Sequence, residues 1–343
     1  MKRAIVVGLL TVLLVSGVGC FGTPQGASSS DRFETFTDWC RSRDSLTPEA
    51  QHTVDKLLEE AETQTCDQAN SELTNLTLLF LNDNQIVDVA PLASLNNLTE
   101  LWLEGNQIVD VAPLASLTNL TDLYLRGNRI VDVAPLASLT NLFWLELQSN
   151  QIIDVAPLAN LTDLVHLYLE NNRIVDVAPL ANLTNLINLY LRGNRIVDVA
   201  PLANLTGLTN LYLYDNQIVD VSPLAHLINL RWLELTANRI VDVAPLANLT
   251  NLGWLFLHFN QIADVGPLAN LTGLSWLFLE KNRIVDVAPL ASLANLTQLD
   301  LRDNQIVDVS PLANLINLRW LGLRSNPLRD RTCPVQPETI CWF

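Results

Sequence analysis

The dominant pattern along the chain is a hydrophobic repeat with a period of 22 residues. Each unit follows L-x-x-L-x-L-x-x-N-x-I-x-D-V-x-P-L-A-x-L-x-N, as in residues 98–119. Its asparagine recurs in twelve registers without an insertion, at Asn84, Asn106, Asn128, Asn150, Asn172, Asn194, Asn216, Asn238, Asn260, Asn282, Asn304 and Asn326. Self-similarity at a fixed period is the sequence signature of a solenoid. We therefore expect one elongated domain of twelve repeats at 76–326.

Each repeat predicts one short strand followed by a compact outer turn. Leu101 and Leu103 flank Trp102, so the alternation of a strand places both leucines on one side and the tryptophan on the other. Successive strands would stack in parallel about 4.8 Å apart, which makes the sheet roughly 50 Å long. The repeated proline, such as Pro113, favours a tight turn or short 3₁₀ segment. Strands on one side and narrow turns on the other predict a horseshoe with its sheet on the concave side.

The repeat unit resembles the leucine-rich repeat. Its length and the segment D-V-x-P-L-A-x-L are most similar to the internalin type of bacterial surface proteins, over roughly residues 76–328. The resemblance implies an α/β leucine-rich-repeat solenoid, with a parallel β-sheet on the concave side and short turns or 3₁₀ segments on the convex side. It also implies a protein partner on the concave face. Host-cell invasion is not implied, because this sequence has neither the immunoglobulin-like domain nor the cell-wall sorting signal of internalins.

A helical cap is expected before the repeats, at 32–75, because the apolar edge of the first coil would otherwise face water. Thr47 followed by a proline is typical of a helix start. Four apolar residues then fall on one helical face: Val54, Leu57, Leu58 and Ala61. We expect a disulfide between Cys40 and Cys66 to join this helix to the first coil.

A second cap is expected at 327–343, where Pro327 and Leu328 break the repeat. The residues that can cover the last coil are Val335, Ile340, Trp342 and Phe343. A disulfide between Cys333 and Cys341 would close this segment. The ending resembles the C-terminal flanking caps of extracellular leucine-rich-repeat proteins.

Residues 1–19 predict an export signal, with two basic residues followed by an apolar run from residue 4 to about 15. This run is too short to span a bilayer permanently. The sequence G-V-G-C at 17–20 resembles the lipobox of bacterial lipoproteins, although the family usually has a branched aliphatic residue in place of Gly17. The resemblance implies cleavage before Cys20 and lipid attachment there. Ordinary cleavage at small residues near Cys20 is the alternative.

The cysteine count fits lipidation. Two cap disulfides use four of the five cysteines and leave Cys20 as the odd one, as expected for a lipid-carrying residue at a mature N-terminus. A free thiol is the alternative. Residues 20–31 are rich in Gly and Ser and predict a flexible tether. We expect an exported, membrane-anchored lipoprotein that faces the periplasm or the cell surface, or otherwise a secreted protein.

The charge balance argues against nucleic acid as a partner. The chain has 20 Lys and Arg against 36 Asp and Glu, a formal net charge of −16. Phosphate contacts need clustered basic residues, and the basic residues here never form a run. For the same reason the sequence offers no polybasic patch for a membrane surface.

Two polar ladders accompany the leucines. The repeated asparagine is expected to be buried and to pair with backbone groups of its own and the adjacent coil. The second ladder consists of Asp88, Asp110, Asp132, Asp154, Asp176, Asp198, Asp220, Asp242, Asp264, Asp286 and Asp308. Each aspartate precedes the proline turn, where its carboxylate can cap backbone amides. Calcium binding is the alternative, although no oxygen-dense loop with a glycine accompanies the ladder.

No catalytic site is expected. The histidines are His52, His166, His226 and His258. Two of them, His166 and His258, fall on the presumed concave side, but four repeats separate them, roughly 19 Å at the spacing of a sheet. The sequence contains no zinc-type spacing, phosphate loop or nucleophile elbow. We therefore predict no enzyme activity, no cofactor and no metal site.

The outward strand positions carry the candidate binding surface. Eight of the twelve residues between the paired leucines are aromatic, and five tryptophans form a second column two positions earlier. The predicted partner-binding residues are Phe80, Trp102, Tyr124, Trp144, Tyr168, Tyr190, Tyr212, Tyr214, Trp232, Trp254, Phe256, Trp276, Phe278 and Trp320. A long exposed aromatic stripe usually marks an interaction surface. The alternative is that these rings merely pack against cross-strand neighbours.

Charged residues of both signs surround the aromatic positions and could orient a partner. They are Glu100, Glu104, Arg126, Glu170, Arg192, Glu234, Glu280, Arg302 and Arg324. We expect a monomeric, non-catalytic protein that binds another protein on its concave face, because its area suits an interface of standard size. Polysaccharide binding or adhesion is the main alternative, since a row of rings with carboxylates could also hold a glycan. An inert envelope spacer and an enzyme are the remaining alternatives.

Overall fold

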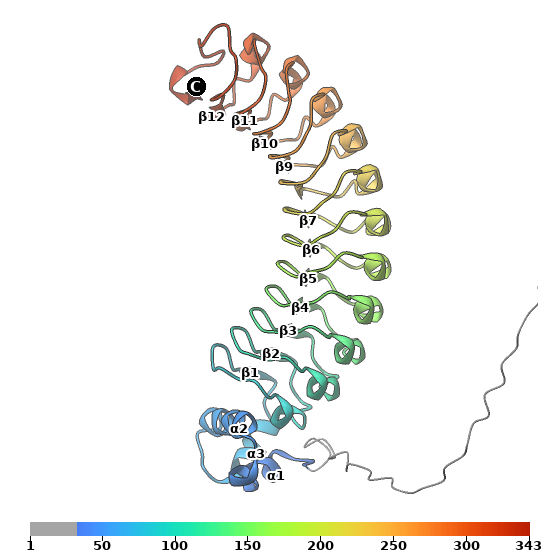
Figure 1. Ribbon diagram of the computed structural model, residues 1–343, viewed down its shortest axis with the longest axis vertical. Helices are drawn as coiled ribbons and strands as arrows, with labels where there is room; N and C mark the ends of the chain where they lie inside the picture. Colours follow the sequence, from blue (N-terminus) through green and yellow to red (C-terminus); the bar gives the residue numbers. More distant parts are fainter. Residues whose placement is uncertain (1–32) are drawn as a thin grey trace, which may run out of the picture.

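The computed structural model describes residues 33–343, which form one curved solenoid. In Figure 1 the coils follow an arc, with the strands on its inner side and the short helices on its outer side. The expected horseshoe, with a parallel sheet on the concave side and 3₁₀ segments on the convex side, is confirmed. The export signal and Cys20 lie outside the described residues, so export and lipidation stay predictions.

The N-terminal cap contains three α-helices where the sequence predicted one. They are α1 (Phe36–Arg41), α2 (Pro48–Glu60) and α3 (Cys66–Thr74), with a 3₁₀ turn η2 (Arg43–Ser45) after α1. The helix start is confirmed, because the Thr47 side chain accepts a hydrogen bond from the Ala50 amide at 3.2 Å. Val54, Leu57 and Leu58 are buried against the first coil, as expected. Within residues 33–343 no helix has the length and apolarity needed to cross a membrane.

The N-terminal disulfide lies within the cap. Cys40 is in α1 and Cys66 begins α3, so their bond joins two helices. The expectation that it would join the long helix to the first coil is therefore wrong. Helix α2 instead contacts that coil through side chains, and the Thr53 hydroxyl donates a hydrogen bond of 2.6 Å to the Asp88 carbonyl. The disulfide stiffens the cap, and packing and hydrogen bonds attach it to the repeats.

Twelve repeat strands and one cap strand form a single parallel sheet in sequence order. The strands are β1 (Leu78–Phe80), β2 (Glu100–Trp102), β3 (Asp122–Tyr124), β4 (Trp144–Glu146), β5 (His166–Tyr168), β6 (Asn188–Tyr190), β7 (Asn210–Tyr212), β8 (Trp232–Glu234), β9 (Trp254–Phe256), β10 (Trp276–Phe278), β11 (Gln298–Asp300), β12 (Trp320–Gly322) and β13 (Cys341–Trp342). Equivalent residues pair across β1–β12, for example Leu189 with Leu211. This register brings corresponding outward side chains into straight columns.

A 3₁₀ helix forms the outer part of each coil. These are η3 (Ala90–Leu92), η4 (Ala112–Ser116), η5 (Ala134–Ser138), η6 (Ala156–Asn160), η7 (Ala178–Asn182), η8 (Ala200–Asn204), η9 (Ser222–His226), η10 (Ala244–Asn248), η11 (Gly266–Asn270), η12 (Ala288–Ser292) and η13 (Ser310–Asn314). The repeated aspartate precedes each one, and its Oδ1 accepts a hydrogen bond from the amide two residues on, at 2.8 Å in Asp110. All eleven aspartates make this bond, so the capping interpretation is confirmed.

The core is a continuous stack of leucine, isoleucine and valine side chains, nearly all fully buried. The asparagine ladder runs along one edge of this core. Asn216, for example, donates from Nδ2 to the carbonyls of Leu191 (3.0 Å) and Leu213 (3.1 Å), and its Oδ1 accepts from the Ile196 amide (3.0 Å). These bonds join neighbouring coils and satisfy backbone groups that the short strands leave free. The structural interpretation of the ladder is therefore confirmed.

The C-terminal cap adds β13 to the sheet, where the Leu323 amide donates to the Trp342 carbonyl at 2.7 Å. The disulfide between Cys333 and Cys341 is present, and Val335 is buried on the last coil. Trp342 does not cover that coil as expected, because its side chain is 62% exposed. The strand alternation at β13 turns this ring away from the core and toward the concave side.

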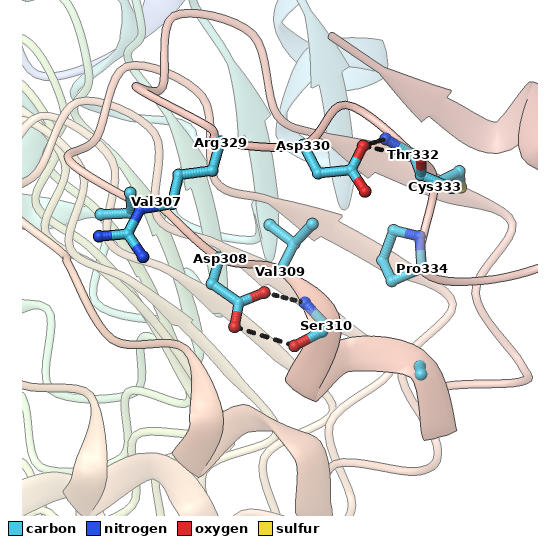
Figure 2. A pocket seen from close by; sticks show the side chains of 10 residues that line it. Val307, Asp308, Val309, Ser310, Arg329, Asp330, Thr332, Cys333 and Pro334 are labelled. Carbon is cyan, nitrogen blue, oxygen red and sulfur yellow. Dashed lines mark hydrogen bonds between the residues drawn. The ribbon is translucent and has the colours of Figure 1, made fainter.

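A seam remains between the last repeat and this cap. It contains a hollow of about 370 Å³ next to η13, and Figure 2 shows the side chains that line this hollow. The Asp308 carboxylate accepts hydrogen bonds from the Ser310 amide (2.8 Å) and hydroxyl (2.9 Å). Asp330 accepts from the Thr332 amide and hydroxyl in the same way. Because both carboxylates already cap their own turns, this hollow is a junction between two structural units.

Candidate ligand-binding surface

The concave surface consists of the outward side chains of β1–β12. Their first and third residues point away from the leucine core, while the central leucine is buried. The third positions form an aromatic column of Phe80, Trp102, Tyr124, Tyr168, Tyr190, Tyr212, Phe256 and Phe278. The first positions form a tryptophan column of Trp144, Trp232, Trp254, Trp276 and Trp320. The remaining predicted residue, Tyr214, follows β7, and the Arg192 guanidinium lies 4.7 Å from its ring centre.

Rings of the aromatic column stack on one another along the sheet. The ring centres of Tyr168 and Tyr190 are 4.3 Å apart, and those of Tyr190 and Tyr212 are 4.2 Å apart, with interplanar angles of 13° and 8°. Trp102 and Tyr124 stack at 3.8 Å. Parallel strands in register produce this stacking, because equivalent side chains lie one strand spacing apart. The cross-strand packing given as an alternative therefore occurs, and the rings turn their edges, more than their faces, toward the concave side.

Burial among neighbouring rings raises the pKa values of tyrosine hydroxyls that are already neutral at pH 7. It raises the pKa of Tyr124 to about 12, with a further contribution from the carboxylates of Asp122 and Glu100. Burial raises the pKa values of Tyr168 and Tyr212 as well. At neutral pH these hydroxyls thus remain hydrogen-bond donors as well as acceptors. A row of neutral hydroxyls beside half-buried rings suits contacts that are partly apolar and partly polar.

The tryptophan column is concentrated in the C-terminal half. Trp232 lies 5.6 Å from Trp254 and 4.9 Å from Phe256, measured between ring centres, so the two columns meet. The Trp232 Nε1 is buried without a hydrogen-bond partner among the described residues. In the N-terminal half, the Trp144 Nε1 donates to Glu146 at 2.9 Å. The indoles at β8–β10 lie on three consecutive strands, so here the tryptophan column is uninterrupted.

A polar gap interrupts the tryptophan column at its centre. His166, Asn188 and Asn210 occupy the first positions of β5, β6 and β7. Their side chains form a chain in which Asn188 Nδ2 lies 2.6 Å from His166 Nδ1, and Asn210 Nδ2 donates to Asn188 Oδ1 at 2.5 Å. Burial lowers the pKa of His166, which favours the neutral ring at pH 7. These amides were not predicted as part of the site, because asparagine alone carries no clear functional signal.

Carboxylates gather around the N-terminal part of the aromatic column. Glu100 accepts a hydrogen bond of 2.7 Å from the Trp102 Nε1. Burial raises the pKa of Glu104, and the nearby Glu146 raises it further. Burial likewise raises the pKa of Glu170. The N-terminal end of the concave surface is therefore acidic.

The C-terminal end contains a buried ion-pair cluster. Asp300 is fully buried, and its two oxygens accept from Arg302 Nε at 2.9 Å and Nη2 at 2.6 Å. The same Nη2 donates to Glu280 at 2.9 Å. His258 lies beside them, with its Nδ1 3.9 Å from the Glu280 carboxylate, and burial lowers its pKa. Arg302 thereby neutralises a carboxylate that would be costly to bury alone.

The same cluster has the donor types of a metal site. Ligand atoms of His258, Glu280 and Asp300 lie within 4.8 Å of one another, and within residues 33–343 no other group of three such residues does so. However, Arg302 binds both carboxylates on this side. A cation would have to displace its guanidinium, so the arrangement is that of an ion-pair cluster. The aspartate ladder forms no such group in the described part of the chain, which gives the calcium alternative no support.

One strained aromatic residue was missed by the sequence analysis. Phe259 has φ of +53° and is 46% exposed, and the Lys281 Nζ lies 4.4 Å from its ring centre. A positive φ is uncommon for a bulky residue. The residue before every repeated asparagine adopts this conformation, and three of the twelve are glycine. A large aromatic residue at a position that requires left-handed backbone is the sequence signal that could have identified Phe259, which follows His258 at the rim of the concave surface.

The repeats identify the class of protein. Four segments match the family described as "Leucine Rich repeats (2 copies)" and together span half of the chain: 74–116, 140–182, 184–226 and 272–314. The chain belongs to the leucine-rich-repeat proteins.

Comparison with solved structures narrows this class to the internalin type. The inlF internalin of Listeria monocytogenes is 33% identical with a TM-score of 0.72, and the match covers 84% of this chain and 92% of that one. The inlC2 internalin of the same organism is 36% identical with a TM-score of 0.50, over 64% and 88% of the two chains. A leucine-rich-repeat protein of Leptospira interrogans is 26% identical with a TM-score of 0.71, over 79% and 77%. This protein is an internalin-type leucine-rich-repeat protein. A search of curated proteins gives no match.

Proposed function

We propose that this protein is a non-catalytic extracytoplasmic binding protein whose concave surface binds another protein. The observation that carries the proposal is the pair of aromatic columns on β1–β12, which are partly exposed, aligned by the sheet register and interrupted by polar residues. Contiguous apolar surface of this extent is rare on a soluble protein unless it serves an interaction. Tryptophan and tyrosine are also the residues that contribute most to protein interfaces.

The dimensions of the surface suit a folded partner or a long peptide. Twelve strands at about 4.8 Å give a length of roughly 50 Å, enough for a standard interface of about 800 Å² per partner. Apolar rings, neutral hydroxyls and carboxamides such as Asn188 and Asn210 lie along it. This mixture of apolar centre and polar contacts is typical of protein interfaces.

Polysaccharide is the less favoured ligand. A sugar ring binds an aromatic residue best when the face of the aromatic ring is free, and the Tyr168, Tyr190 and Tyr212 faces are stacked against one another. The edges and hydroxyl groups of these tyrosines remain free to contact a ligand. They suit the mixed polar and apolar side chains of a protein. Retention of polysaccharide instead of protein by the purified chain would reverse this preference.

The location of the protein is proposed to be outside the cytoplasm, on a lipid anchor at Cys20. The disulfides Cys40–Cys66 and Cys333–Cys341 support an oxidising compartment, since such bonds are rare in the cytosol. The lipobox-like sequence at 17–20 supports membrane attachment. In this proposal the N-terminal cap lies nearest to the membrane, and the protein acts as a monomer whose concave surface is free.

The test is capture of a partner from cell-envelope extract by the full chain and by a variant with Trp254→Ala and Trp276→Ala. Both indoles are partly exposed and lie outside the leucine core, so the variant should keep its circular dichroism spectrum. Affinity for the captured protein should fall at least about 30-fold for each indole if they are interface hot spots. The matched control is Val175→Ala with Val219→Ala, which removes two exposed apolar side chains from the flank of the solenoid. Equal binding by wild type and the tryptophan variant would refute the proposed surface.

A further inference from the structure

The concave surface ends in a hollow with an unusual composition. About 470 Å³ in volume, it lies beside β12 and β13 and is lined by Arg302, Trp320, Arg324, Trp342 and Phe343. A second hollow of about 390 Å³ adjoins it, since Arg302 and Trp320 line both. The first one has two cationic and three aromatic side chains and no acidic residue in its lining. The lining is thus cationic and aromatic, with the carboxylates of Asp300 and Glu280 bound to Arg302 directly beside it.

A glycine makes room for the tryptophan that forms one wall of this hollow. Gly322 occupies the third position of β12, where most other repeats have an aromatic residue. A Cβ at this position would lie 2.6 Å from the Trp320 Cη2 and 2.8 Å from the Asp300 Oδ1. Trp320 therefore lies over Gly322, with its ring 6.2 Å from that of Phe278 between centres. The absence of a side chain at this position lets the Trp320 ring lie across the end of the aromatic column, where it forms a wall of the hollow.

The two arginines differ in how their charge is compensated. Arg302 is fixed by Asp300 and Glu280 through Nε and Nη2, and no hydrogen bond of its Nη1 to a described residue is found. The Arg302 guanidinium also lies 5.5 Å from the Trp320 ring centre. Arg324 forms no ion pair within the described part of the chain. The hollow thus offers one guanidinium that two carboxylates hold in place, Arg302, and one without an ion pair among the described residues, Arg324.

We propose that this hollow binds the free C-terminal carboxylate of a polypeptide whose last residue is apolar. Arg324 is the single guanidinium here without an ion pair within residues 33–343, and one such charge suits a monoanion better than a phosphate, which carries more charge. The planar fork of a guanidinium matches a carboxylate, so Arg324 would bind it directly and Arg302 Nη1 would add a donor. The aromatic rings of Trp320, Trp342 and Phe343 would pack against the apolar side chain of the same terminal residue. The inference rests on the proposed function, because the rest of that polypeptide would lie along the concave surface.

The test uses two pools of fluorescein-labelled pentapeptides, with four randomised positions and a C-terminal leucine or phenylalanine. One pool has a free carboxylate and the other a C-terminal amide, and binding to the full chain is followed by fluorescence anisotropy. The free-acid pool should bind at least about tenfold more tightly than the amide pool, because a charge-assisted hydrogen bond contributes more than a neutral one. Arg324→Gln should remove this difference. Arg324 is exposed, so the variant should fold, and Arg239→Gln, at an exposed arginine between two coils of the flank, is the matched control.

Several results would overturn the inference. These are equal binding of the acid and amide pools, unchanged binding by Arg324→Gln, or no binding of the acid pool at millimolar concentration. Stronger competition by inorganic phosphate than by acetate would identify the hollow as a phosphate site instead. A protein whose capture needs Trp254 and Trp276 but not Arg324 would keep the proposed function and reject the carboxylate site. Binding of the acid pool by the wild-type chain, when that chain captures no protein from the extract, would keep the carboxylate site and reject the proposed function.

Discussion

The asparagine ladder gives the sharpest test of how the coils are held together. In Asn216→Ala the Ile196 amide loses its hydrogen-bond acceptor, and no other acceptor is within reach of it among the described residues. The Leu191 and Leu213 carbonyls each keep one hydrogen bond. Asn194 donates to Leu191, and Asn238 donates to Leu213. The substitution therefore leaves one buried donor unpaired and leaves each of these two acceptors with one partner in place of two. The Tyr214 carbonyl loses only a long contact of 3.4 Å and keeps its hydrogen bond from the Gly193 amide.

The expected loss of stability follows from this count. A buried orphaned donor costs about 1–3 kcal/mol, and each lost carbonyl bond about 0.5–1.5 kcal/mol. The free energy of unfolding should thus fall by about 2–6 kcal/mol. Asn229→Ala is the matched control, because Asn229 makes a single bond of 2.8 Å to the Thr206 carbonyl at an exposed position, where water can replace it. The control should lose less than about 1 kcal/mol.

The assay is urea unfolding followed by circular dichroism, combined with amide hydrogen exchange. Repeat proteins can unfold in parts, so exchange at Ile196 reports whether the damage is local to the coil interface. We expect this amide to lose protection in Asn216→Ala and to keep it in Asn229→Ala. If the two variants have the same stability within experimental error, the ladder does not join the coils as argued.

Two further predictions concern charge and anchoring. Burial raises the pKa of Glu234 above its value in the unfolded chain, so the folded protein binds this proton more tightly than the unfolded chain does. The stability that protonated Glu234 contributes is therefore present below about pH 4.5 and is lost as the pH rises through the raised pKa. Glu234→Gln should therefore become more stable than wild type as pH rises toward 7, in urea titrations at several pH values, and a difference that shrinks with rising pH would contradict the argument. Separately, Cys20→Ala should release the protein from membranes in cell fractionation, and unchanged retention would reject the lipid anchor.

Much of the fold could be predicted from the period alone. The spacing of Asn106, Asp110 and Pro113 within one repeat determines the strand, the cap and the 3₁₀ turn, because each residue acts on backbone groups within its own or the next coil. The positions of the aromatic residues followed as well, since strand alternation decides which side chains face outward. What the spacing did not reveal is which helix of the N-terminal cap each cysteine joins, because that depends on how three short helices pack.

The chemistry of the concave surface was decided by the tertiary structure. In the sequence Glu280, Asp300 and Arg302 are three of many charged residues. Only the register of β10 and β11 brings the Arg302 guanidinium within hydrogen-bond distance of both carboxylates. Trp342 was expected to cover the core, yet β13 adds to the sheet edge and turns its ring toward Arg324 and Trp320.

The sequence by itself determined the repeating coil, since a 22-residue period fixes local hydrogen bonds and the buried leucines. The tertiary structure decided which rings stack, which arginine is neutralised and where the concave surface ends. The physical reason is that these contacts join residues about one period or more apart, and their geometry depends on the curvature and register of the assembled sheet.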